Sequence, residues 1–357
     1  MSLGAWKGDQ IMRSACLDCI LRLGFVAGAT LLAIATSVHA QGNQGYYAGK
    51  TLTIVIGNSA GSGYDGYGRL IARFMANHLP GRPGVLAQNM PGAGGVRAAD
   101  YLYNIAAKDG TVMGHFNPAA LVEPLTNPAT RQRYDPTRFL YIGTAVNSTR
   151  VCFTSERSKV KTFEDVQRTT AIMAATQPAA VARLVQNVAK ARFQIVTGYP
   201  GPNEVFLAVE RGEADGICGF DINAVTALRP GLIESGKLNM LLQIGAEASP
   251  KAWLTQRGVP QIWRYVAQED RPLVELAVTD QIFQRSFVAP PDTPPAQAGM
   301  LRAAFEAAVR EPELLEEAKR ANLEIDPKPG AAVEAAVRNM YDTPKDLVAR
   351  FTQMTRH

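Results

Sequence analysis

The chain has 357 residues, of which 37 are Lys or Arg and 32 are Asp or Glu, giving a formal net charge of +5. This mild excess of basic residues is spread along the chain, which argues against nucleic-acid binding. The length suffices for two α/β domains of ordinary size, and the low aromatic content of 8% suits helices packed closely on parallel sheets.

Residues 1–40 are predicted to be a secretory signal peptide. Residues 21–35 are apolar apart from Arg22, and Val38-His39-Ala40 has small residues at the −3 and −1 positions. We therefore expect cleavage after Ala40 and a periplasmic location. A membrane anchor is the alternative, although the apolar run is short for a membrane span. Three basic and two acidic residues lie within 1–40, so the mature chain keeps 34 basic and 30 acidic residues.

A glycine-rich turn follows the first predicted strand of the mature chain. The strand covers residues 51–56, and a helix-like run covers residues 69–75. Such a turn aims backbone N–H groups and the positive end of a helix at one point, which favours anion binding. Asp65 is equally suited to capping the helix, and Arg69 to pairing with Asp65. The candidate ligand-binding residues of this turn are Asn58, Ser59, Gly61, Ser62, Gly63 and Asp65.

A second glycine-rich turn has the same arrangement. It lies between a predicted strand at 85–89 and a helix-like run at 98–106. Glycine at these positions also permits a tight turn without any ligand. If the two turns converge, they suit a small ligand with a carboxylate or phosphate group. The candidate ligand-binding residues here are Asn89, Gly92, Ala93, Gly94 and Gly95.

Strand and helix signals alternate along the rest of the chain in two blocks. This alternation predicts an α/β protein with two doubly wound domains, whose ligands bind at the carboxyl ends of the strands. Both glycine turns fall at such ends. Further strands are expected at 139–146, 170–174, 194–197, 238–243 and 286–289, and helices at 179–190, 204–211, 296–310, 312–321, 331–340 and 345–355.

Two enzyme motifs also occur in the first turn. Residues 61–66 match G-x-G-x-x-G, but no acidic residue ends the second strand to bind a ribose, so no dinucleotide cofactor is expected. Residues 57–61 match G-x-S-x-G, which leaves an exported serine hydrolase using Ser59 as an alternative. His115 is its candidate partner. No residues show metal-ligand spacing, so we expect neither a metal nor another cofactor.

Cys152 and Cys218 are the cysteines that remain after removal of the signal peptide. Both lie in segments that read as strands. An even pair in an exported chain indicates a disulfide if those strands are neighbours. Two buried free thiols are the alternative.

Five segments in order resemble the periplasmic solute receptors of tripartite tricarboxylate transporters, the Bug-type receptors. AGSGYD at 60–65 with Arg69 is similar to the A-G-G-x-x-D-x-x-x-R motif of that family, and NMPGAGG at 89–95 is similar to its N-x-P-G-A-G-G loop. The other three segments are KDGT at 108–111, GYPG at 198–201 with GEAD at 212–215, and FVAPPDTP at 287–294.

The resemblance implies a type II periplasmic binding protein, with two α/β lobes joined by two crossover strands and a ligand cleft between them. Lobe one is then residues 48–145 plus 286–357, and lobe two is residues 146–285. The implied function is that of a monomeric receptor, not an enzyme, which holds a small organic acid and delivers it to membrane permease subunits. A receptor that feeds a sensor protein is a further alternative. Tyr199 and Asp221 are the candidate ligand-binding residues of lobe two.

The chain departs from the family pattern in two places. It has Gly57-Asn58-Ser59 where the family has Pro-Phe-Pro, which adds polar side chains at the cleft. The glycine- and serine-rich loop of lobe two appears here as residues 174–180, where a proline, which has no N–H group, replaces glycines. The ligand is therefore expected to differ from the dicarboxylates and amino acids common in the family.

Overall fold

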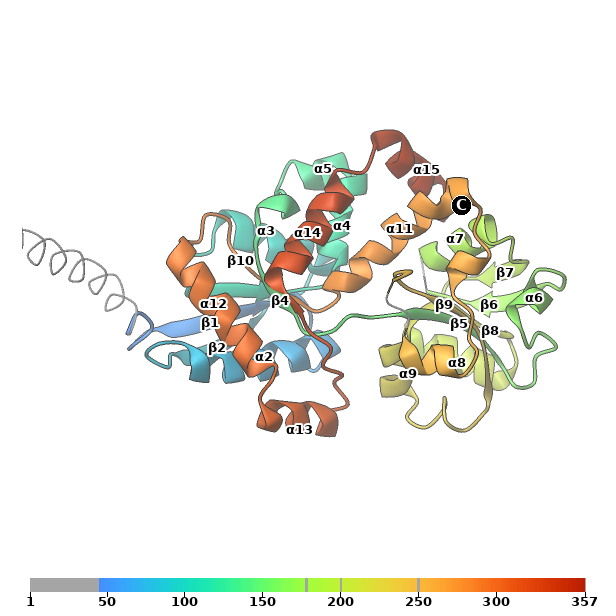
Figure 1. Cartoon of the computed structure of the whole chain (residues 1–357), viewed down its shortest axis with the longest axis horizontal. Coiled ribbons are helices and arrows are strands. Elements are labelled where there is room, and N and C mark those ends of the chain that lie inside the picture. Colours follow the sequence, from blue (N-terminus) through green and yellow to red (C-terminus); the bar gives the residue numbers. More distant parts are fainter. Residues whose placement is uncertain (1–44, 177–178, 200, 249–250, 357) are drawn as a thin grey trace, which may run out of the picture.

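The computed structural model describes residues 45–356 except 177–178, 200 and 249–250, so the predicted signal peptide lies outside the described residues. Figure 1 shows two lobes, each with helices on both faces of a sheet. This arrangement confirms the predicted α/β class. We keep the predicted ranges as the definitions of lobe one and lobe two.

Lobe one is built on a sheet whose strands, within the described residues, run in the order β11-β4-β10-β3-β1-β2. Strand β1 is rich in β-branched residues, and the apolar residues of its second half are buried. The strands are β1 Thr51–Ile56, β2 Gly84–Asn89, β3 Val112–His115, β4 Leu140–Thr144, β10 Ser286–Ala289 and β11 Lys328–Pro329. One apolar core packs α2, α12 and α13 on one face, and another packs α3, α4 and α14 on the other. The helices are α2 Gly63–His78, α3 Val96–Asn104, α4 Ala119–Thr126, α5 Pro128–Arg131, α12 Pro295–Ala308, α13 Pro312–Arg320, α14 Gly330–Tyr341 and α15 Lys345–Arg356.

Lobe two has a second sheet with the order β7-β6-β8-β5-β9 in the described part of the chain. Its strands are β5 Arg150–Ser155, β6 Ala171–Ala174, β7 Phe193–Val196, β8 Gly216–Asp221 and β9 Leu238–Ile244. Its helices are α6 Phe163–Val166, α7 Ala180–Val188, α8 Pro202–Arg211, α9 Ile222–Leu228, α10 Ala252–Gln256 and α11 Arg271–Thr279. Short 3-10 turns add η1 Ala93–Gly95 and η2 Pro136–Arg138 in lobe one, and η3 Ile262–Arg264, η4 Gln268–Asp270 and η5 Asp280–Phe283 in lobe two.

The sheets are mixed rather than fully parallel. Strand β1 is parallel to β2 and β3, whereas β10 is antiparallel to β3 and β4. In lobe two, β6 is parallel to β7 and β8, whereas β5 is antiparallel to β8 and β9. The antiparallel strands are those by which the chain enters lobe two and returns to lobe one. The expected strand at 139–146 ends at Thr144, and residues 145–149 carry the chain between the lobes.

The last helix, α15, reaches from lobe one to lobe two (Figure 1). Leu347, Phe351 and Met354 pack against the core of lobe two. Asn187 Nδ2 of α7 donates to the carbonyl of Met354 at 3.1 Å, and Arg350 forms an ion pair with Asp270. The C-terminal part of the chain therefore ties the two lobes together on the side of α11.

None of the helices in the described residues is long and apolar enough to cross a membrane.

Candidate functional site

The loops after β1, β2 and β3 leave the sheet of lobe one at the same edge. Ile56, the last residue of β1, is in register with Asn89 of β2 and His115 of β3. Met90 N donates to the carbonyl of Ile56 at 2.7 Å, and Gly57 N donates to the carbonyl of His115 at 2.9 Å. The hydrogen bonding of β1 with β2 and β3 therefore continues to the first residue after β1 and β2. Both glycine turns start from this hydrogen-bonded edge of the sheet.

The two glycine turns lie against each other. A β-carbon on Gly57 would lie 2.5 Å from the β-carbon of Phe116 and 3.3 Å from the Cα of Gly95. Glycine is required there by this close approach. In the second turn, Gly92, Gly94 and Gly95 have φ values of 142°, 63° and 97°, a region that side chains disfavour. The convergence that the sequence left conditional is present in the structure.

A polar network beneath the turns fixes their shape. The carboxylate of Asp65 accepts hydrogen bonds from Gly61 N, Arg69 Nε and Asn89 Nδ2, each at 2.9 Å. Asn89 Nδ2 also donates to the carbonyl of Asn58 at 2.9 Å. Burial alone raises the pKa of Asp65, but the hydrogen bonds from Gly61, Asn89 and Arg69 outweigh it, so the pKa lies below its ordinary value. Asp65 therefore stays ionised and joins the first turn to the end of β2.

The other predicted residues of the two turns are at or near the surface of this edge. Ser62 caps α2, because its hydroxyl accepts from Asp65 N at 3.2 Å. Asn58 is half-buried, and its Oδ1 atom is buried without a partner among the described residues. Gly95 is buried against Phe116. Some N–H groups of the turns already have acceptors: Ser62 N donates to the carbonyl of Ser59 at 3.2 Å, and Gly95 N donates to the carbonyl of Gly92 at 2.9 Å. The exposed residues are Ser59, Gly61, Gly63, Gly92, Ala93 and Gly94.

Arg285 lies beside the first turn of α2, and no local sequence pattern pointed to it. Its guanidinium carbon is 4.0 Å from the ring centroid of Tyr64 and 5.3 Å from that of Tyr67. Both tyrosines belong to the first two turns of α2. The chain places Arg285 there by returning from lobe two directly before β10, a long-range relationship with no local pattern.

The predicted residues of lobe two lie at the carboxyl ends of β7 and β8. Asp221 caps α9 by accepting from Asn223 N at 2.8 Å, and it also accepts from the hydroxyl of Ser148. Tyr199 follows β7 and packs, partly buried, against the core of lobe two. Both side chains thus have partners inside lobe two.

The loop of lobe two that departs from the family pattern borders a small cavity. This cavity has a volume of about 160 Å³ and lies at the start of α7, beside the ends of β6 and β8. Residues 177–178, including the proline, lie outside the described residues.

Cys152 and Cys218 are opposite each other on the neighbouring antiparallel strands β5 and β8, and their sulfur atoms are bonded. Both side chains are buried in lobe two. The bond closes a loop with a sequence separation of 66 residues. It therefore links the strand that enters lobe two to the strand that ends at Asp221.

His115 is fully buried, and its Nε2 atom has no hydrogen-bond partner among the described residues. Its ring stacks on Phe287 with centroids 4.4 Å apart, and its Nδ1 atom lies 2.8 Å from the carbonyl of Ser286. Burial lowers the pKa of His115 to about 3. Within the described residues, no hydrogen bond joins the imidazole to the exposed Ser59. The dyad that a serine hydrolase needs is therefore not assembled here.

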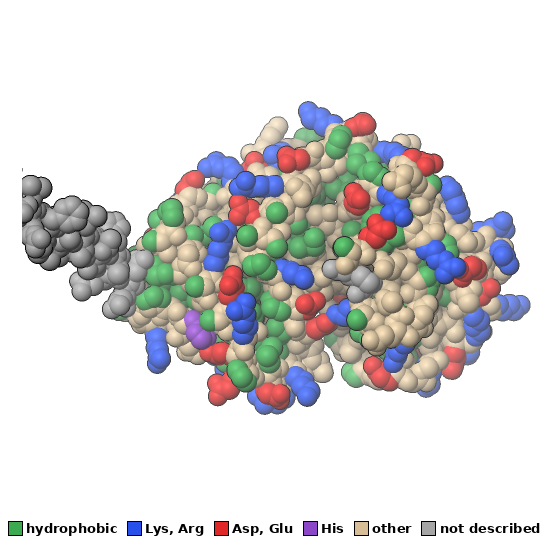
Figure 2. All heavy atoms as spheres, viewed as in Figure 1, with side chains coloured by type: hydrophobic (Ala, Val, Ile, Leu, Met, Phe, Trp, Pro, Cys, Tyr) green, Lys and Arg blue, Asp and Glu red, His purple; other side chains and the backbone are tan. Residues whose placement is uncertain are grey.

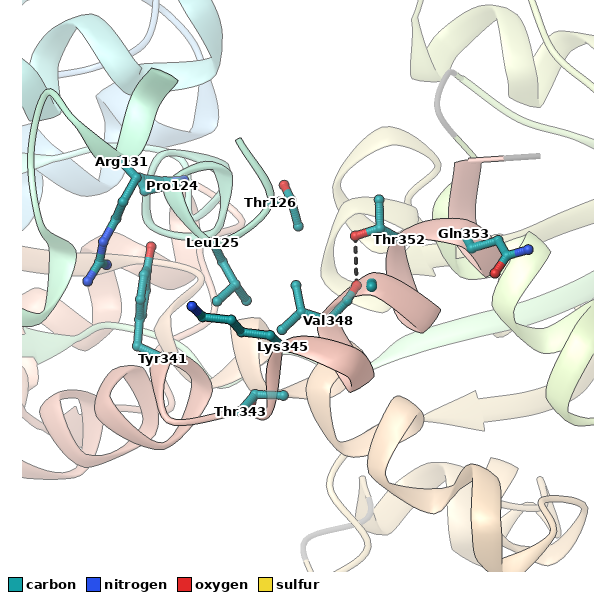
Figure 3. A pocket seen from close by; sticks show the side chains of 11 residues that line it. Pro124, Leu125, Thr126, Arg131, Tyr341, Thr343, Lys345, Val348, Thr352 and Gln353 are labelled. Atoms are coloured by element: carbon teal, nitrogen blue, oxygen red, sulfur yellow. Dashed lines mark hydrogen bonds between the residues drawn. The ribbon is translucent and has the colours of Figure 1, made fainter. Parts of the chain in front are cut away.

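Two larger hollows are lined by residues outside the glycine turns. One, of about 710 Å³, separates α9 and α10 of lobe two from the segment after α13, and Figure 2 shows the surface hollowed between the lobes on this side. Lys251 and Glu324 form an ion pair across it. The other, of about 680 Å³, lies between α4, α5 and α15 (Figure 3). There Arg131 lies over the ring of Tyr341 and is paired with Asp135.

The described residues bring together no group of three or more His, Cys, Asp or Glu side chains that could hold a metal ion.

No protein-family model and no curated protein matches the chain. Solved structures do. A TctC solute-binding protein from Polaromonas superposes with a TM-score of 0.63 at 19% identity, covering 84% of this chain and 98% of that one. MatC from Rhodopseudomonas palustris, solved with bound malate, gives 0.55 at 17% identity, with 85% and 98% covered. R. palustris Rpa4515, solved with adipate, gives 0.58 at 15% identity, with 85% and 97% covered.

Identities this low show a common fold. The superpositions cover 98%, 98% and 97% of these three neighbours. The chain therefore has the two-lobed fold of periplasmic solute-binding proteins.

Proposed function

We propose that this protein is a periplasmic receptor that binds a small organic acid between its lobes and delivers it to the permease of a tripartite tricarboxylate transporter. The observation that carries the proposal is the contact between the two glycine turns at Gly57 and Gly95. It joins the two turns at one edge of the sheet, where the positive end of α2 and the N–H groups without an acceptor inside the turns favour an anion.

In this proposal the carboxylate is held mainly by those N–H groups of residues 59–64 and 92–95 that do not already donate within the turns, as Gly61 N, Ser62 N and Gly95 N do. Ser59 is exposed at the same edge and adds a hydroxyl. Asn58 is half-buried at the start of the first turn, and the nitrogen of its side-chain amide can donate to the carboxylate. Asp65 and Asn89 support the site indirectly, because their hydrogen bonds fix the conformation of the turns. The neighbours solved with malate and adipate support a carboxylic acid as the class of ligand.

Thermal-shift screening of residues 41–357 against malate, adipate and other small carboxylic acids tests this proposal. An acid at 100 times its dissociation constant stabilises the folded state by about 2.7 kcal/mol. For an acid that binds, Ser59→Ala is expected to weaken binding by about 1 kcal/mol, the usual contribution of one neutral hydrogen bond.

A p-nitrophenyl ester assay separates this proposal from the hydrolase alternative. The receptor shows no turnover that depends on Ser59. A hydrolase shows turnover that Ser59→Ala abolishes while binding stays nearly intact.

A further inference from the structure

Arg285 has a cationic group without a counterion. No carboxylate oxygen of the described residues lies within 4.0 Å of its guanidinium nitrogens in the ion pairs of this structure. Its Nη1 atom donates to the carbonyl of Gln284 at 3.1 Å, and its Nε atom is buried without a partner. Arginine stays charged at any physiological pH, and a partly buried charge is costly unless an anion compensates it.

The carboxylates around this group are committed elsewhere. Asp221 and Asp280 are the acidic residues whose charges act on the neighbouring Tyr64. Asp221 accepts from Ser148 and from Asn223 N. Asp280 forms a two-point ion pair with Arg150, with N–O distances of 2.9 and 2.6 Å. Neither acid is therefore the partner of Arg285 in this structure.

The guanidinium also lies beside the first residue of α2, which belongs to the proposed anion site. The nearest atom to a β-carbon built on Gly63 is Arg285 Nη2, at 4.0 Å. Gly63 is the first residue of α2, so the cation lies beside the positive end of that helix. The positive charge of Arg285 and the partial positive charge of the helix end repel each other, which costs free energy unless an anion binds between them.

Tyr64 orients the cation and supplies a further donor. Its ring stacks under the guanidinium, a cation–π contact that fixes the plane of the group. Burial raises the pKa of Tyr64 to about 12, so its hydroxyl is protonated at neutral pH and can donate. Arg285 and the start of α2 thus present donors to one place, and the ring of Tyr64 holds the guanidinium there.

We propose that Arg285 selects anionic ligands in this cleft: its guanidinium donates to a carboxylate oxygen of a ligand seated against the first turn of α2. A planar fork of N–H donors matches a carboxylate better than a lysine does. This inference rests on the proposed receptor function and narrows it, because it makes a negative charge at that position a condition of binding.

Calorimetric titration of four substitutions tests the inference with the acid that binds best among malate, malonate, succinate, glutarate and adipate. The variants are Arg285→Gln, Arg285→Met, Arg285→Lys and the control Arg82→Gln. Arg82 is exposed just before β2, at the opposite edge of the same sheet, and loses the same charge. Arg285→Met keeps an unbranched side chain against the tyrosines. Either neutral variant can be used for the comparison if its melting temperature equals that of the wild type.

Neutral variants are expected to lose about 10- to 100-fold in affinity, the range for a hydrogen bond to a charged group. Arg285→Lys is expected to fall between them and the wild type, with Arg82→Gln unchanged. The uncharged diamide of the same acid is expected not to bind the wild type. A neutral variant within twofold of the wild type overturns this inference and leaves the receptor function standing. A wild type that binds none of the acids overturns the receptor function and the role of Arg285 together.

Discussion

Gly57 and Gly95 come so close that a β-carbon on Gly57 would lie 3.3 Å from the Cα of Gly95. One glycine opens the turn after β1, and the other ends the turn after β2. Their contact joins the two turns at one edge of the sheet, which is the edge that we propose binds an anion.

Gly57→Ala is therefore expected to damage both folding and binding. The new methyl group would lie 2.5 Å from the β-carbon of Phe116, which cannot rotate away, so the loops after β1 and β3 must move apart. Overpacking of this kind costs about 1–3 kcal/mol of folding free energy. Urea denaturation measures it.

Gly299→Ala is the matched control for that change. Gly299 lies inside α12, and nothing lies within 4 Å of a β-carbon there. Replacing a helical glycine by alanine is expected to stabilise the protein by about 0.5–1 kcal/mol. Equal effects of the two substitutions would show that the turns do not need the contact at Gly57.

His115 is expected to make the protein sensitive to acid. Its folded-state pKa of about 3 lies below the value of about 6.5 in the unfolded chain, so the unfolded state takes up the proton first. Stability is present above pH 6.5 and is lost as the pH falls toward 3. At pH 5 this proton uptake costs about 2 kcal/mol relative to pH 8.

His115→Asn tests that assignment, because asparagine keeps a donor for the carbonyl of Ser286 but does not titrate. Urea denaturation at pH 5 and pH 8 should show a smaller difference in unfolding free energy for the variant than for the wild type. The same difference in both proteins would place the acid sensitivity at other groups.

The disulfide between Cys152 and Cys218 is expected to contribute about 4 kcal/mol to the stability of the oxidised protein, on the loop-closure model for a separation of 66 residues. Calorimetry of the wild type and of the double variant C152A/C218A, with and without reductant, measures it. Reductant should lower the melting temperature of the wild type by several degrees and leave that of the variant in place. Two titratable thiols in the unreduced, denatured wild type would contradict this prediction.

The ion pair between Lys251 and Glu324 is expected to hold the lobes in their present arrangement. Lys251 belongs to lobe two and Glu324 to lobe one, and the lysine side chain is only 16% exposed. Glu324→Gln should therefore increase the radius of gyration of the unliganded protein in small-angle X-ray scattering. Glu317→Gln, which breaks an ion pair with Arg73 inside lobe one, is the control. An unchanged radius in Glu324→Gln would show that other contacts set the lobe arrangement.

Local patterns predict much of this fold. The helices from α12 to α15 and the strands β6 and β9 agree with the expected ranges to within a few residues. The signals that predict them, which are hydrophobic periodicity, glycines and prolines, lie within each segment itself. The sequence alone is therefore sufficient to place these helices and strands. The fold class follows from the order of these segments.

The features that depend on distant segments were not predictable in the same way. Arg285 reaches α2 because of where the chain re-enters lobe one, and α15 reaches lobe two because of its packing on α7. For Asp65 the sequence allowed both a helix-capping and a ligand-binding role. The structure shows its bonds to Gly61 and Asn89, and the latter forms only because β1 and β2 are neighbours.

A crystal structure of the protein with the best-binding acid tests the central claim most directly. We expect a carboxylate oxygen of the acid within hydrogen-bond distance of N–H groups in both turns, those of residues 59–64 and those of residues 92–95. An acid bound elsewhere, such as the hollow between α4 and α15 in Figure 3, with both turns empty, would contradict the account.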